Sequence, residues 1–107
     1  MPSETRRITF SSDELIQALI RLRRDARKPL PQSRIRGIKV ENGEAGVPHV
    51  SIALDIEGES IELSPTEVAV ALIKFCRQKK IPLPRRAEKS LAVDRGDIAL
   101  VLHSEDR

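Results

Sequence analysis

The spacing of hydrophobic residues predicts two helices. Apolar side chains recur at i, i+3, i+4 and i+7 from Leu15 to Leu22, and again in the same spacing from Val68 to Phe75. This spacing is typical of the buried face of an amphipathic helix. The second stretch is also apolar at most intervening positions up to Cys76. We therefore expect the second helix to be the more deeply buried one.

Local signals mark where both helices begin and end. The segments 11–14 and 64–67 each match the capping box S-x-x-E. In this motif the serine side chain accepts a first-turn N–H and the glutamate accepts the N–H of the serine. A Pro-Leu-Pro segment follows each helix, at 29–31 and 82–84. Because proline disfavours a helical residue before it, each helix should end there, with the leucine against the edge of the core.

Short extended stretches separate and flank the helices. Six of them have strand character: residues 7–10, 37–40, 50–56, 60–63, 89–93 and 98–102. Strict alternation over 50–56 predicts a strand with one buried face, whereas 98–102 is apolar on both faces and favours a central position. Glycine-containing turns join these stretches into hairpins, including a tight turn at 57–59.

The chain contains an internal repeat. Residues 8–43 align with residues 61–96 at a constant offset of 53, and 12 of the 36 aligned positions are identical. The tripeptide Ile-Ala-Leu at 52–54 recurs at 98–100 after a seven-residue slip. We therefore expect a tandem β-α-β-β repeat, with copies at 8–56 and 61–103.

The expected fold is one α+β domain over residues 1–107. One copy of about fifty residues has too thin a core to stand alone. A mainly antiparallel sheet of about six strands, with both helices on one face and a pseudo-twofold axis between the copies, would bury both apolar faces together.

Composition is that of an ordinary soluble protein, with 39% hydrophobic and 33% charged residues. Phe10 and Phe75 are the only aromatic residues, so the core must be aliphatic. No apolar run reaches the roughly 18 residues of a spanning helix, and the N-terminal residues lack the apolar region of a secretory signal. Cys76 is the only cysteine and is expected as a small buried hydrophobe, which fits a cytoplasmic location.

No catalytic or metal-binding constellation is evident. The sequence lacks GxSxG, HExxH and the glycine-rich phosphate loops. His49 and His103 are not equivalent under the repeat and are expected as exposed strand-end residues. The acidic residues between Asp55 and Glu62 are expected on a solvated strand face that discourages edge pairing. We therefore expect no enzyme activity, no cofactor and no metal.

The charges fall into blocks. Residues 21–39 carry a net charge of +7, residues 40–73 a net charge of −7, and residues 74–89 a net charge of +6. The helix dipole accounts for bases in the last turn of each helix but not for those in the loops beyond. Five bases in or just after these loops are candidate anion contacts: Arg34, Arg36, Arg85, Arg86 and Lys89.

The segment from Ile81, IPLPRRAEKSLAVDRGDIALVL, resembles the C-terminal part of a group of short bacterial proteins of uncharacterised function. These proteins have a capped helix, an IPLPR-x-x-K-x-L segment and a G-D hairpin. The resemblance covers residues 61–102, and the first copy matches loosely because Gln32 and Ser33 stand in place of Arg85 and Arg86. It implies that single-copy relatives dimerise as the two halves of this chain pair, and it brings no known activity.

The basic loops are the main functional indication. Loops related by a pseudo-twofold axis can meet two phosphates or two acidic patches, and arginine binds both groups bidentately. The scarcity of aromatic residues argues against stacking on single-stranded bases. We expect a small binding or regulatory protein that contacts the backbone of double-stranded nucleic acid. A protein-interaction module using the basic face or an exposed strand edge is the alternative, and a merely solvated basic surface is equally compatible.

Overall fold

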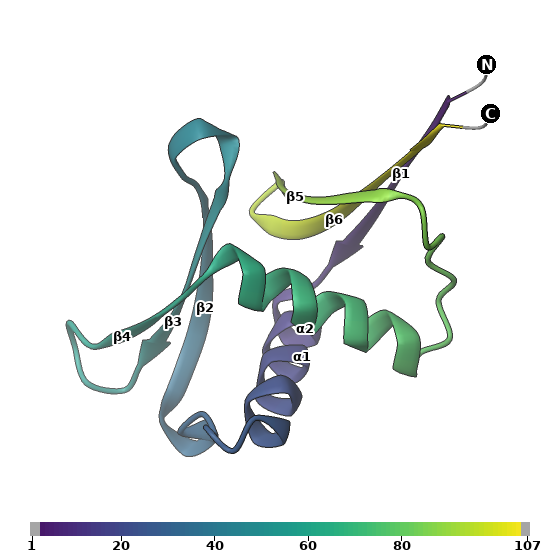
Figure 1. Cartoon of the computed structure of the whole chain (residues 1–107). Helices are drawn as coiled ribbons and strands as arrows, with labels where there is room; N and C mark the ends of the chain where they lie inside the picture. Colours follow the sequence, from purple (N-terminus) through teal and green to yellow (C-terminus); the bar gives the residue numbers. More distant parts are fainter. Residues whose placement is uncertain (1–2, 106–107) are drawn as a thin grey trace.

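The computed structural model describes residues 3–105, which form an α+β fold of two helices and six strands (Figure 1). These elements and two short 3-10 turns follow one another as β1 (Ser3–Phe10), α1 (Ser12–Asp25), η1 (Gln32–Arg34), β2 (Ile35–Asn42), η2 (Glu44–Gly46), β3 (Pro48–Leu54), β4 (Ser60–Leu63), α2 (Pro65–Gln78), β5 (Glu88–Asp94) and β6 (Asp97–Glu105). No helix within residues 3–105 is long and apolar enough to cross a membrane.

The strands form two three-stranded antiparallel sheets, ordered β1-β6-β5 and β2-β3-β4. The prediction of a single sheet of about six strands, with both helices on one face, is therefore wrong. An alternating pattern specifies which face of a strand is buried but not which strand lies beside it. Here β6 and β3 take the central positions, and β2 and β5 remain edges with no ladder between them. Each helix contacts a strand of both sheets.

Each sheet combines segments from both halves of the chain. β1 pairs with β6 along its whole length, from Ser3 opposite Glu105 to Phe10 opposite Ile98. β4 pairs with β3 in the same antiparallel sense. The first strand of each half thus lies beside the last strand of the other half, so neither half builds a sheet from its own strands alone.

The predicted hairpins are confirmed. β2 pairs with β3, β3 with β4 and β5 with β6. Arg95 and Gly96 between β5 and β6 have φ values of 53° and 84°, and two consecutive positive φ angles match the two-residue type I′ turn. That turn has the same right-handed twist as the strands it joins, so it sets the register of the hairpin.

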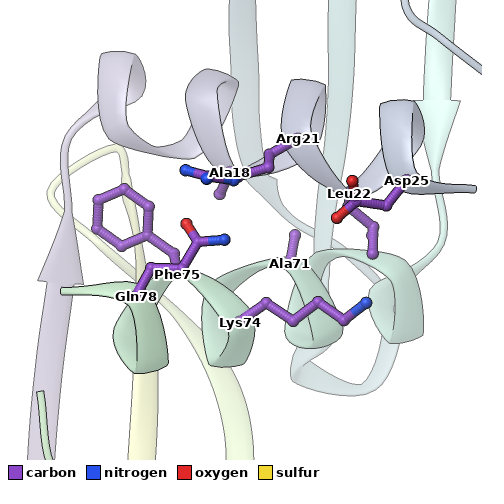
Figure 2. Close-up of a pocket in the computed structure, with 8 residues that line it drawn as sticks. All are labelled: Ala18, Arg21, Leu22, Asp25, Ala71, Lys74, Phe75 and Gln78. Carbon is purple, nitrogen blue, oxygen red and sulfur yellow. The ribbon is translucent and has the colours of Figure 1, made fainter. Parts of the chain in front are cut away.

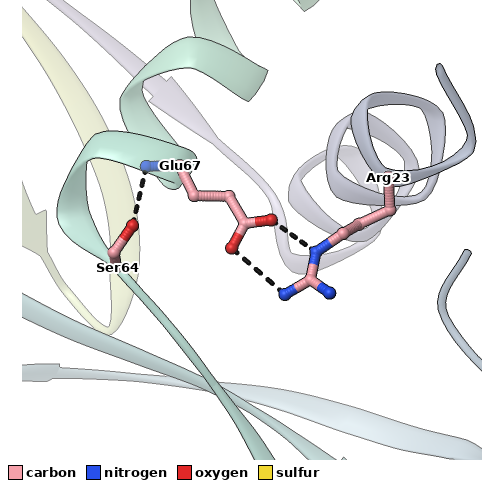
Figure 3. A network of polar contacts seen from close by, with 3 residues as sticks. All are labelled: Arg23, Ser64 and Glu67. Carbon is pink, nitrogen blue, oxygen red and sulfur yellow. Dashed lines mark hydrogen bonds and ion pairs between the residues drawn. The ribbon is translucent and has the colours of Figure 1, made fainter. Parts of the chain in front are cut away.

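Both helices begin at the predicted serine caps, but only the first capping box is complete. The Ser11 N–H donates to Glu14 Oε1 at 2.8 Å, and the Glu14 N–H donates to Ser11 Oγ at 3.2 Å. At the second helix the Glu67 N–H donates to Ser64 Oγ at 3.1 Å, while the Glu67 carboxylate binds the guanidinium of Arg23 instead of the cap (Figure 3). The prediction of a complete capping box at the second helix is therefore wrong, because Arg23 of α1 binds the Glu67 carboxylate.

Both helices end with the same backbone geometry. The residue after each C-cap, Arg27 or Lys80, has a left-handed φ of 60° or 58°. The N–H groups of the following residues, Lys28 and Ile81, donate to carbonyls five residues earlier at 2.9 and 2.8 Å. This pattern is the Schellman motif, which normally places glycine where these two bases stand.

Both sheets and both helices contribute to one buried aliphatic cluster. The greater burial of α2 is confirmed, with five buried side chains against three in α1, and so is the central position of β6. The rings of Phe10 and Phe75 meet edge to face, with centroids 5.8 Å apart. Leu30 of the first Pro-Leu-Pro segment is buried, as expected, and Leu83 of the second is half-buried.

Candidate functional site

The two basic loops lie at separate ends of the helix pair (Figure 1). Arg34 lies in η1 and Arg36 in β2, whereas Arg85 and Arg86 lie in the loop before β5 and Lys89 lies in β5 itself. The structure therefore groups the five predicted residues into two sets. In the set at the end of α2, Arg85 and Lys89 line a groove together with a further base, Arg77.

Arg34 forms ion pairs with two carboxylates of this chain. Its Nε donates to Asp55 Oδ1 at 3.0 Å and its Nη2 donates to Glu59 Oε2 at 2.7 Å. These two hydrogen bonds raise the pKa of Arg34 above its ordinary value, because both carboxylates favour the charged guanidinium. Asp55 and Glu59 are exposed, as expected, and they are also the counter-ions that tie η1 to the β3–β4 turn.

A groove of about 470 Å³ lies between the end of α2, the second Pro-Leu-Pro loop and β5. Three bases and three aliphatic residues line it: Arg77, Arg85, Lys89, Ile73, Ile81 and Leu83. The aliphatic side chains are half-buried and pack against the core. Among the described residues, no carboxylate lines this groove. We call it the basic groove; its volume falls within the usual range of ligand clefts.

The loop that forms one wall is held without using its arginines. Arg6 Nη1 in β1 donates to the Pro82 carbonyl at 3.0 Å. Lys89 Nζ donates to the carbonyls of Pro84 and Ala87 at 3.4 and 3.2 Å. The Ala87 side chain is buried. Since carbonyls are neutral, the charge of Lys89 remains available to an anion. These bonds also hold the loop in place before any ligand binds.

Arg77, Arg85 and Arg86 are exposed, and within residues 3–105 they make no ion pair or hydrogen bond. Arg77 is the residue that the sequence prediction missed, because a base in the last turn of a helix is explained by the dipole alone. Its identity with Arg24 under the repeat was the one available signal.

The other candidate residues have ordinary roles. His49 Nε2 lies 3.5 Å from Glu62 Oε1, and His103 Nδ1 lies 2.9 Å from Thr5 Oγ1. Cys76 is buried, and burial raises the pKa of its thiol, which keeps it protonated and unreactive. In the part of the chain that the structure describes, no three His, Cys, Asp or Glu side chains are placed to hold a metal ion.

A second hollow lies between the two helices and has room for about one water molecule (Figure 2). In this view the labelled residues run in opposite directions along α1 and α2. The eight lining residues form four pairs at the offset of 53: Ala18 and Ala71, Arg21 and Lys74, Leu22 and Phe75, Asp25 and Gln78. The hollow is too small for a ligand and is the packing seam of the helix pair.

No protein-family model, curated protein or solved structure matches this chain. The functional assignment therefore depends on the chemistry of the basic groove. That chemistry combines three cations with an aliphatic floor, which suits a ligand that is both anionic and apolar.

Proposed function

We propose that the protein is a non-catalytic interaction module that binds an acidic segment of a partner protein in the basic groove. The supporting observation is that Arg77, Arg85 and Lys89 line the groove together with three aliphatic residues, and that no carboxylate within residues 3–105 lines it. Aspartate or glutamate side chains of the partner would accept charge-assisted hydrogen bonds from the three bases. An aliphatic side chain beside them would cover the half-buried floor.

The groove favours a protein partner over a nucleic acid. The nucleic-acid expectation relied on two equivalent basic loops, but the loops lie at separate ends of the helix pair and Arg34 is already bound by Asp55 and Glu59 (Figure 1). A phosphate backbone also offers no aliphatic group to cover the floor. The protein-interaction alternative from the sequence is therefore the better supported one.

We also propose that the scaffold is a gene-duplicated, pseudo-twofold unit. Three observations support this: the two sheets have the same strand order when β1 is matched to β4, the helix seam is lined by residue pairs at the offset of 53, and both helices end in the same motif. The proposal makes the first half a natural control for the second. The first-half counterparts of Arg77 and Lys89 are Arg24 and Arg36.

The test is selection from a displayed library of random 12-residue peptides. We expect wild-type protein to enrich peptides that carry two or more acidic residues next to an aliphatic one. The double variant Arg77→Gln/Lys89→Gln should bind a labelled selected peptide at least 10-fold more weakly, since two charge-assisted bonds are lost. The matched variant Arg24→Gln/Arg36→Gln, with the same change of net charge, should bind as the wild type does.

Two results would overturn the proposal. One is the absence of acidic enrichment relative to a selection on the double variant. The other is an equal loss in both double variants, because binding would then follow net charge and not the groove. Random-sequence duplex DNA is the competing probe. For each phosphate contact, the logarithm of the DNA-binding constant should fall by about 0.9 per unit of the logarithm of salt concentration. Tight DNA binding with this salt dependence, and without peptide binding, would assign the groove to nucleic acid.

A further inference from the structure

A second groove, of about 410 Å³, adjoins the basic groove along β5. One wall consists of the consecutive residues Lys89, Ser90 and Leu91 of β5. The facing wall consists of residues 45–48 and the beginning of α2. Lys89 lines both grooves, so together they form one continuous path that starts at the three bases and runs along β5.

The wall formed by β5 is the free edge of a sheet. β5 is the outer strand of the order β1-β6-β5, and among the described residues β6 is its only ladder partner, although residues of β2 and β3 also come close to it. An edge strand presents a row of backbone N–H and C=O groups that can pair with a further strand. The three consecutive residues of β5 that line the groove are consistent with such an edge forming its wall.

The facing wall offers apolar contact. Val47 is 43% exposed and lines this groove together with the half-buried Leu91. Pro65 and Ala69 of α2 extend the same wall. Lys89 is the one charged residue of the described chain that lines this second groove, so the positive charge is concentrated at one end of the path.

We infer that the partner segment binds in an extended conformation, as a fourth strand on the free edge of β5. This inference rests on the proposed function of the basic groove. The segment has acidic residues at the end that meets Arg77, Arg85 and Lys89, and small aliphatic residues at the end that lies between Val47 and Leu91. An extended segment advances roughly 3.3 Å per residue along such a path. Addition of a strand to a sheet edge is an established mode of peptide recognition.

The charge distribution favours a separate partner over a second copy of this chain. The Asp55 and Glu59 carboxylates are bound by Arg34, and the Glu67 carboxylate by Arg23. Three of the carboxylates that a second copy could offer are therefore already bound within the fold. Self-association that blocks peptide binding would contradict this choice and is measured by light scattering of the free protein.

The decisive experiment is an N-methyl scan of a selected peptide against the intact protein. In an added strand, alternate backbone N–H groups point toward β5 and the others point away. Methylation at every second position should weaken binding about 3- to 10-fold, and methylation at the positions between should have little effect. A helical or side-chain-only mode has no such period of two.

A pair of matched variants tests the facing wall. Val47→Glu places a carboxylate in the path and should weaken binding about 5-fold or more. Ile56→Glu, at a comparably exposed aliphatic residue outside both grooves, should leave binding unchanged. Peptide binding that depends on Arg77 and Lys89 but shows neither the period of two nor the Val47 effect would overturn the strand inference alone. Absence of acidic-peptide binding would overturn the proposed function as well.

Discussion

The ion pair between Arg23 and Glu67 should contribute measurably to stability, because it joins the two helices at a half-buried site. Both guanidinium Nε and Nη2 donate to the Glu67 carboxylate, with the second bond at 3.2 Å, and each side chain keeps only 22% of its exposure (Figure 3). Arg23 lies in the last turn of α1 and Glu67 in the first turn of α2, so each charge also matches the dipole of its own helix.

The magnitude follows from two opposing effects. Two charges about 4 Å apart attract by about 4 kcal/mol at an effective dielectric constant of 20. Desolvation of both ions and the ordering of two long side chains offset most of this gain. Exposed pairs contribute up to about 1 kcal/mol, so this bidentate, half-buried pair should couple by about 1–2 kcal/mol.

A double-mutant cycle with Arg23→Ala and Glu67→Ala measures that coupling. Urea unfolding followed by far-UV circular dichroism is the suitable assay, because the chain has no tryptophan or tyrosine. Arg23→Ala should be the less harmful single change, since the freed Glu67 carboxylate can then accept the N–H of Ser64 and complete the capping box. Glu67→Ala has no such compensation.

The pair Lys39 and Glu41 is the matched control. It lies within one exposed strand, with 69% and 48% of the side chains exposed and 3.5 Å between the charged atoms. Its coupling should stay below about 0.5 kcal/mol. If the Arg23–Glu67 coupling is no larger than that of the control, the pair is not the link between the helices that its geometry indicates.

Two further predictions concern stability. Replacing Arg27 or Lys80 by glycine should raise the free energy of unfolding by about 0.5–1 kcal/mol, because glycine removes the steric strain of a left-handed φ. Replacing Lys74, inside α2, by glycine should lower the free energy of unfolding by about 1 kcal/mol. A loss of stability at all three sites would refute the strain argument. Burial raises the pKa of Cys76, so above the ordinary thiol pKa of about 8.5 the unfolded chain releases a proton that the folded chain keeps. Wild-type stability should therefore decline by up to about 1.4 kcal/mol per pH unit relative to Cys76→Ala between pH 8.5 and 10, and parallel stability curves would contradict this.

The parts of the fold that depend on neighbouring residues were predictable from the sequence. Helix starts at Ser11 and Ser64 follow from side-chain caps within one turn, and the hairpin at Arg95-Gly96 follows from a two-residue turn. The central position of β6 was also predictable, because a strand that is apolar on both faces must be covered on both.

Strand partners and ion-pair partners were not predictable, because they depend on residues far apart in sequence. Nothing in the period of β1 or β4 indicates that each pairs with the opposite half of the chain. Arg34 resembled the other loop bases until the fold placed Asp55, 21 positions later, within 3.0 Å. Glu67 matched the capping box fully in sequence, and only the approach of Arg23 from α1 redirected its carboxylate.

Differences between the two halves explain why Arg34 is ion-paired in the first half, whereas Arg85 and Arg86 make no ion pair within residues 3–105 in the second. The offset of 53 maps Arg34 onto Ala87. In the first half the loop is held by the ion pairs of Arg34, whose charge is thereby balanced by Asp55 and Glu59. In the second half the equivalent position is a buried alanine, so the loop is held by apolar packing and by bonds to backbone carbonyls. Arg85, which stands at the position of Gln32, is exposed and has no counter-ion within residues 3–105, so the proposed partner carboxylate would be its first.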